Sequence, residues 1–160
     1  MISLADAIHE DAVLVHPAAD DKWSLIRVMC GSLVEAGQVP AGSADRVLEA
    51  VLVREESMST GMEMGIALPH ASVPSLDSLA VALAVLPDGM DFPAMDGMPT
   101  RIVILLAIPH NDRILHVRTM AHASRLLHDE STRNALLCST RPAQVLSALH
   151  EAEARLKQVT

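Results

Sequence analysis

The chain has almost no aromatic residues. Trp23 and Phe92 are the only two among 160 residues, and tyrosine is absent. Sequence-independent binding of single-stranded nucleic acid depends on aromatic side chains that stack on bases, so this composition argues against it. Basic residues are also few, because 12 Lys and Arg stand against 20 Asp and Glu and leave a formal net charge of −8. Since polyanions are bound through basic surfaces, nucleic acid is not an expected partner.

Cysteines and long apolar runs are scarce as well. Cys30 and Cys138 form no CxxC pair and are expected to be reduced thiols. The longest apolar runs, 79–86 and 102–108, are far shorter than the ~20 residues that span a bilayer as a helix. The first residues carry acids and lack the basic segment of a signal peptide. We therefore expect a cytoplasmic protein without direct membrane insertion.

The residues that are present predict an α/β fold. Half of them are apolar, and the length suits a single domain over 1–160. Apolar residues at helical spacing predict helices over 22–36, 44–56, 113–128, 131–138 and 142–156. Short apolar runs predict strands over 66–68, 79–86 and 101–108, with 87–100 as a loop. This order predicts a small sheet flanked by helices on both faces.

Eight histidines are the candidate chemical groups. Four of them recur every six residues, at His110, His116, His122 and His128. Six residues turn a helix by roughly 600°, so successive rings on a helix point to different faces and do not form a metal site. We interpret five histidines as ordinary surface or hydrogen-bonded core residues: His9, His16, His122, His128 and His150.

His70 is set apart by its position. The apolar run before it stops at Pro69, which fixes φ and cannot donate a backbone hydrogen bond, so the strand is expected to end there. Ligands gather at the carboxyl ends of strands in open α/β sheets, and a neutral imidazole is a nucleophile or general base near pH 7. A histidine bonded to a backbone carbonyl is the alternative. His116, just past the first turn of helix 113–128, either packs inward or faces an anion.

The segment STGMEMGIALPHASV, residues 59–73, resembles the active-site segment of the IIA proteins of the fructose–mannitol family of the bacterial phosphotransferase system. The matching features are, in chain order, the Arg54-Glu55 pair, the Ser59-Thr60-Gly61 turn, the Pro69-His70 ending and the helix-opening His116. This ordered set is more specific than one Pro-His dipeptide, and the resemblance covers roughly 10–152. It implies the fold of that family, a small mixed sheet with helices on both faces.

The resemblance also implies roles. His70 would accept a phosphoryl group from phospho-HPr and pass it to a IIB domain, as the phosphohistidine intermediate of a sugar-transport relay. Arg54 would hold phosphate oxygens with its fork of donors, and His116 would help to bind or orient the phosphoryl group. The turn formed by Ser59, Thr60 and Gly61 would lie in the vicinity of the phosphoryl group. Phosphoryl transfer of this kind requires no metal and no cofactor.

Two alternatives accompany this hypothesis. A regulatory protein similar to the nitrogen-type members of the family would be phosphorylated at the same place and would act by binding other proteins. The turn Met62-Glu63-Met64, where family members often have a Gly-Asn pair, mildly disfavours it. A metal-binding protein would instead use His70, His110 and His116, although this cluster has no placed Asp, Glu or Cys ligand.

Overall fold

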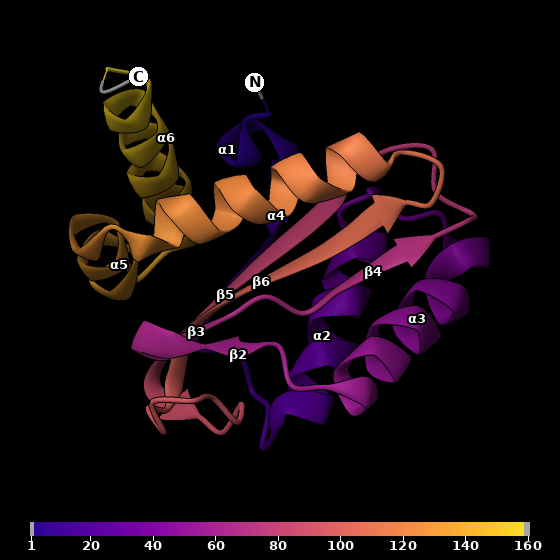
Figure 1. Cartoon of the computed structure of the whole chain (residues 1–160), viewed down its shortest axis with the longest axis horizontal. Helices are drawn as coiled ribbons and strands as arrows, with labels where there is room; N and C mark the ends of the chain where they lie inside the picture. The colour runs from indigo at the N-terminus through magenta and orange to yellow at the C-terminus, as the bar shows by residue number, and fades with distance from the viewer. Residues whose placement is uncertain (1, 159–160) are drawn as a thin grey trace.

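The computed structural model describes residues 2–158, which form a mixed β-sheet between two layers of helices (Figure 1). The helices are α1 (Leu4–Ala7), α2 (Lys22–Glu35), α3 (Ala44–Ser57), α4 (Arg113–His128), α5 (Glu130–Leu137) and α6 (Pro142–Gln158). The strands are β1 (Ile8–Val15), β2 (Gly61–Met62), β3 (Ile66–Ala67), β4 (His70–Val73), β5 (Ala80–Met90) and β6 (Thr100–Pro109).

The sheet has the order β1-β5-β6-β3-β2, and β4 also pairs with β6. The central pair, β5 and β6, is antiparallel. β1 runs parallel to β5, and both β3 and β4 run parallel to β6. Because β3 and β4 follow each other along the same side of β6, β4 forms part of the sheet edge.

Strand β5 explains how the two faces differ. Its larger side chains alternate with alanines, and alternate residues of a strand point to opposite faces. One face takes Val81, Leu83 and Val85, together with apolar residues of α1, α4, α5 and α6. The other face takes Ala80, Ala82 and Ala84, together with apolar residues of α2 and α3. The small alanine side chains leave room for α2 and α3 to pack closely on that face.

The predicted fold class is confirmed, and the helices that the periodicity predicts lie within two residues of their observed bounds. Asp112 caps α4, because its side chain accepts a hydrogen bond from the backbone N–H of Leu115 at 2.8 Å. Ser43 precedes α3 but makes no side-chain capping bond.

Three expectations about strands were wrong or incomplete. β1 was not predicted, because its HED segment interrupts the apolar pattern and coincides with an irregularity in its pairing with β5. The expected loop over 87–100 is too long, because β5 continues to Met90, which pairs with Thr100 of β6. The strand before Pro69 ends as expected, but a further strand that was not predicted, β4, begins at His70. Among residues 2–158, no helix is long and apolar enough to cross a membrane.

Candidate active site

His70 is the first residue of β4 and lies beside the middle of β6, opposite Leu106. Pro69 separates β3 from β4 but does not end the pairing, because its carbonyl accepts a hydrogen bond from the backbone N–H of Leu106 at 2.9 Å. A proline is tolerated here because the lost N–H belongs to an edge segment. His70 therefore follows the end of β3, as expected, and also begins β4, which was not expected.

The side chain of His70 lies on the face of the sheet covered by α4. Its strand neighbours Ala71 and Val73 belong to the core between the sheet and α2 and α3. Side chains alternate along a strand, so His70 and Ser72 point to the opposite face. Nδ1 of His70 lies 2.8 Å from the carbonyl oxygen of Leu68. Because a carbonyl only accepts, Nδ1 carries the proton, and Nε2 keeps its lone pair free.

His116 reaches the same place from α4. Its ring centroid lies 5.5 Å from that of His70, with the ring planes at 89°. Its Nδ1 lies 3.1 Å from the hydroxyl oxygen of Ser72. The sequence interpretation did not include Ser72, although its position two residues after His70 on one strand places both on the same face. The hydroxyl fixes the orientation of the second imidazole beside the first.

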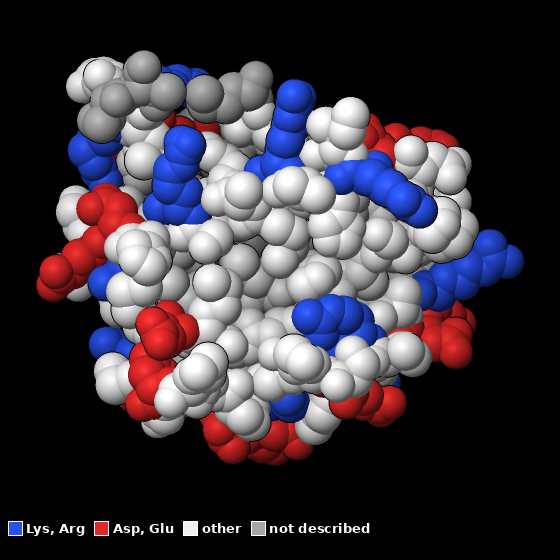
Figure 2. All heavy atoms as spheres, in the orientation of Figure 1, with Lys and Arg blue, Asp and Glu red and all other residues white. Residues whose placement is uncertain are grey.

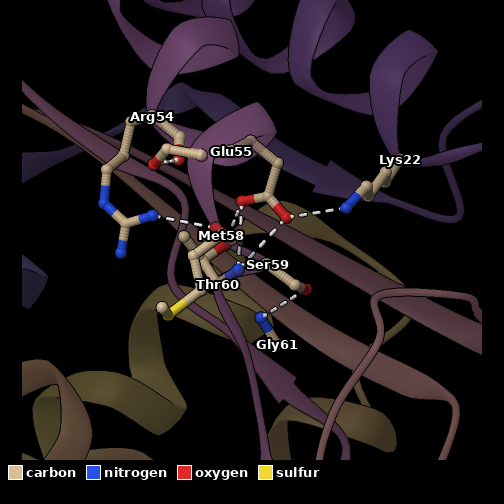
Figure 3. Close-up of polar contacts among 8 residues, drawn as sticks. Lys22, Arg54, Glu55, Met58, Ser59, Thr60 and Gly61 are labelled. Atoms are coloured by element: carbon tan, nitrogen blue, oxygen red, sulfur yellow. Dashed lines mark hydrogen bonds and ion pairs between the residues drawn. The ribbon is translucent and has the colours of Figure 1, made fainter.

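Arg54 comes from the last turn of α3, the helix that packs against β4. Its Nη1 donates to the carbonyl oxygen of Met58 at 2.8 Å. The other guanidinium nitrogens have no partner among residues 2–158, and Figure 3 shows them turned away from Glu55. Nη1 of the guanidinium group is therefore held by Met58, and the other nitrogens are available to bind an anion.

The surroundings lower the pKa of His70 below its ordinary value of 6.5. Burial is the main cause, since it disfavours the charged ring. The hydrogen bond to Leu68 opposes this shift, the positive charge of Arg54 and the proximity of His116 add to it, and the charge of Glu55 opposes it. His70 is thus held neutral at pH 7, which is the nucleophilic form of imidazole.

The turn of Ser59, Thr60 and Gly61 is held by a buried carboxylate that the sequence interpretation did not assign to the site. Glu55 accepts from the backbone N–H of Thr60 at 3.1 and 3.2 Å and from its hydroxyl at 2.5 Å. The ammonium group of Lys22 lies 3.0 Å from the same carboxylate (Figure 3). Ser59 accepts from the N–H of Gly61 at 3.2 Å. Both amides are therefore engaged within the turn.

This turn also supports the approach to His70. The carbonyl of Thr60 accepts from the N–H of Leu68 at 3.1 Å, and Gly61 pairs with Ala67. A Cβ on Gly61 would lie 2.5 Å from the carbonyl oxygen of Phe92 and 2.8 Å from that of Pro93. Only glycine fits that close approach of two backbone segments. The turn therefore positions the segment after β3, where the Leu68 carbonyl orients the ring of His70.

The metal-binding alternative has no ligand set in the part of the chain that the structure describes, because no three His, Cys, Asp or Glu side chains are placed there to hold a metal ion. His110, its third proposed ligand, is exposed in the turn between β6 and α4. Glu63, in the turn that departs from the family pattern, is exposed as well.

Residues 6–152 match the family described as phosphoenolpyruvate-dependent sugar phosphotransferase system, EIIA 2. A fructose-specific EIIA component from Haloferax volcanii is 33% identical over 116 residues, covering 72% of this chain and 74% of the relative. A nitrogen regulatory protein from Bradyrhizobium diazoefficiens is 27% identical, covering 91% of this chain and 94% of the relative. A fructose-specific EIIABC component from Bacillus subtilis is 29% identical over 85% of this chain, which spans 21% of that longer protein.

Solved structures show the same fold. Nitrogen regulatory protein IIA-Ntr from Neisseria meningitidis superposes with a TM-score of 0.81 at 20% identity, covering 91% of this chain and 98% of that one. IIA mannitol from Escherichia coli superposes with a TM-score of 0.74 at 25% identity, covering 89% of this chain and 98% of that one. A chain in a complex of enzyme IIA and phosphorylated enzyme IIB for mannitol from Escherichia coli superposes with a TM-score of 0.75 at 24% identity. The match covers 90% of this chain and 97% of that one.

Proposed function

The chain belongs to the EIIA 2 family of the phosphoenolpyruvate-dependent sugar phosphotransferase system, and we propose that it carries a phosphoryl group on Nε2 of His70. The donor would be phospho-HPr and the acceptor a IIB domain or protein. The observation that carries this proposal is the state of the His70 ring: Nδ1 donates to the carbonyl of Leu68, the pKa lies below 6.5, and Nε2 is left free.

The transfer needs only one bond to form and one to break. The lone pair of Nε2 attacks the phosphorus atom of the donor phosphohistidine, and the phosphorus–nitrogen bond to the donor breaks. The electron pair of that bond returns to the donor ring. His70 keeps its Nδ1 proton, and the carbonyl of Leu68, 2.8 Å away, stabilises the positive charge that the ring acquires. Transfer to the acceptor reverses these steps with the acceptor side chain as nucleophile.

Arg54 and His116 would stabilise the charge of the group in transit. Phosphoryl transfer depends mainly on positioning and on charge stabilisation, for which a planar guanidinium is suited. Arg54 is proposed to bind phosphate oxygens through the nitrogens that Met58 leaves free. Ser72 holds Nδ1 of His116, so its Nε2 is the nitrogen proposed to face the phosphoryl oxygens. Ser59, Thr60 and Gly61 are proposed to support the site through their backbone contacts.

A regulatory role is the second candidate. It is favoured by one observation: the similarity to the nitrogen regulatory protein from Bradyrhizobium diazoefficiens covers 94% of that relative, which is nearly its whole length. The same chemistry at His70 serves both roles. The roles differ in the fate of the phosphoryl group, because a transport component passes it to a IIB protein and a regulator keeps it until it binds its target.

The test is the intact mass of the protein after incubation with phosphoenolpyruvate, enzyme I and HPr. We expect an acid-labile gain of one phosphoryl group that is lost in His70→Ala and retained in His110→Ala, whose ring is exposed outside the site. Unphosphorylated protein beside phosphorylated HPr, or phosphorylation of His70→Ala, would reject the proposal. Adding IIB proteins encoded beside the gene then separates the two roles, because only a transport component loses the group to them.

A further inference from the structure

Helix α4 has an unusual charge for this protein. Its sequence, RILHVRTMAHASRLLH, contains no Asp or Glu, whereas the whole chain has a net charge of −8. Arg113, Arg118 and Arg125 are exposed, and none has a hydrogen bond or ion pair with another residue among 2–158. Figure 2 shows basic side chains rising from the upper part of this face, with acidic ones toward its margins. The helix therefore presents uncompensated positive charge.

Two of these arginines line a cavity. Arg118, His122 and Arg125 are spaced i, i+4 and i+7, which places them on one stripe of the helix. Together with Ile2 and Ala121 they line a cavity of about 620 Å³. This size lies within the roughly 300–1,000 Å³ of small-molecule sites. The cavity combines two guanidinium groups with an apolar wall.

The inner wall of the cavity is fixed by a buried hydrogen-bond network. Nε2 of His122 lies 2.8 Å from Oε1 of Glu153, and the two side chains are only 13% and 5% exposed. Glu153 also accepts from the hydroxyl of Ser3 at 2.6 Å and from the N–H groups of Leu4 and Ala5 at 2.6 and 3.4 Å. Its charge is therefore engaged inside the protein, while the arginines at the rim remain free.

The cavity is separate from the site around His70. Arg118 follows His116 by two positions, a turn of about 200° around the helix, so it leaves α4 on the side away from His116. None of His70, Arg54 and His116 lines the cavity. A ligand bound there would contact α4 on the face opposite to the candidate active site.

We propose that this cavity binds a small phosphate monoester, with Arg118 and Arg125 holding the phosphate and Ile2 and Ala121 contacting the carbon skeleton. Guanidinium forks match phosphate oxygens bidentately, which favours phosphate over a simple halide. The apolar wall favours an ester over inorganic phosphate. The site is independent of phosphoryl transfer, so the proposal does not rest on the function proposed for His70.

Glucose 6-phosphate is a suitable probe for calorimetric titration at constant ionic strength, with glucose, inorganic phosphate and chloride as comparisons. We expect saturable binding of the ester with a Kd of about 1 mM or tighter. Binding should weaken about tenfold in Arg118→Gln and in Arg125→Gln. Arg113→Gln removes an exposed arginine of the same helix outside the cavity and should bind like the wild type, as should His70→Ala. The ring signals of His122 should shift on binding.

Several results would overturn this proposal. They are the absence of saturable binding, equal binding of inorganic phosphate and the ester, and an equal loss of affinity in Arg113→Gln and Arg118→Gln. Loss of binding in His70→Ala would place the ester at the candidate active site instead. Because the arginines are exposed, the variants are expected to fold, and their circular dichroism and melting temperature check this.

Discussion

The imidazole rings of His70 and His116 meet edge to face, with their centroids 5.5 Å apart and their planes at 89°. They come from β4 and α4, elements that the sequence separates by two long strands. Ser72 connects them, since it shares a face of β4 with His70 and lies 3.1 Å from Nδ1 of His116. This arrangement leaves the phosphoryl-accepting nitrogen proposed for His70 beside a second imidazole of fixed orientation.

Replacing His116 should slow phosphorylation of His70 without unfolding the protein. Loss of one fixed group that stabilises transferred charge typically costs about 100-fold in rate, which is the effect expected for His116→Ala. Ser72→Ala removes only the hydroxyl that orients the ring of His116, so we expect the transfer rate to fall by about tenfold. Single-turnover transfer from phospho-HPr measures both, with His110→Ala as the control. Wild-type rates in His116→Ala would show that the ring pair has no part in transfer.

Removing the charge of Arg54 should raise the pKa of His70. The guanidinium disfavours the protonated ring, so Arg54→Gln removes one cause of the lowered pKa, and Arg54→Lys retains most of its effect. An NMR titration of the His70 ring measures the shift. Arg46→Gln is the matched control, because Arg46 is an exposed residue of the same helix. An unchanged pKa in Arg54→Gln would mean that the guanidinium lies too far from the ring to bind its phosphoryl group.

The low pKa of His70 predicts a pH dependence with a definite sign. Its folded pKa lies below the ordinary 6.5, so between these values the unfolded chain binds more protons than the folded one. The contribution of His70 to the free energy of unfolding is thus fully present above about pH 6.5. It is lost as the pH falls through the pKa that His70 has in the folded protein. The rate of phosphoryl acceptance should follow the neutral ring, remain constant down to about pH 6.5 and fall only below it. A rate that already falls between pH 8 and 7 would contradict this.

The sequence predicts the parts of the site that are local in the chain. Periodicity is enough to identify α3 and α4, and the Pro69-His70 break marks the side chain that is proposed to accept the phosphoryl group. Apolar alternation does not reveal β1, because its HED segment interrupts the pattern. The strand after Pro69 was missed for another reason: four residues are too few to show a period, and the partner that makes them a strand, β6, is distant in sequence.

The roles of Ser72, Glu55 and Lys22 could not be predicted from the sequence, again because they depend on residues that the fold brings together. Each depends on a tertiary contact, with His116, Thr60 and Glu55 respectively, and a serine or an acid at a helix end is usually exposed. The resemblance identified Arg54 and His116, but the contacts that orient them come only from the fold.

Adding a methyl group at Gly61 should destabilise the protein. The new Cβ would lie 2.5 Å from the backbone oxygen of Phe92, and backbone must move to relieve the contact. We expect Gly61→Ala to lower the free energy of unfolding by about 1–3 kcal/mol. Gly31→Ala is the matched control, because a Cβ there meets nothing within 4 Å. In the interior of α2 it should stabilise by about 0.5–1 kcal/mol. Denaturant unfolding of both variants distinguishes the clash from a general effect of alanine.

Neutralising Glu55 should loosen the turn that precedes the site. The carboxylate is buried and accepts three hydrogen bonds from Thr60, and it lies 3.0 Å from the ammonium group of Lys22, whose side chain is 13% exposed. Glu55→Gln keeps the shape but leaves that ammonium group without a counter-charge, a change that costs about 3 kcal/mol when the partner is buried.

Glu56→Gln is the control for this change. Glu56 is the next residue of the same helix but is exposed, so its replacement should alter the free energy of unfolding by less than about 0.5 kcal/mol. Glu55→Gln should also slow phosphoryl acceptance, because the turn positions Leu68, whose carbonyl orients the ring of His70. The double variant Lys22→Met with Glu55→Gln also removes the unpaired ammonium group. It should therefore recover part of the free energy of unfolding that Glu55→Gln loses. If Glu55→Gln and Glu56→Gln unfold at the same denaturant concentration, the buried carboxylate does not hold the turn.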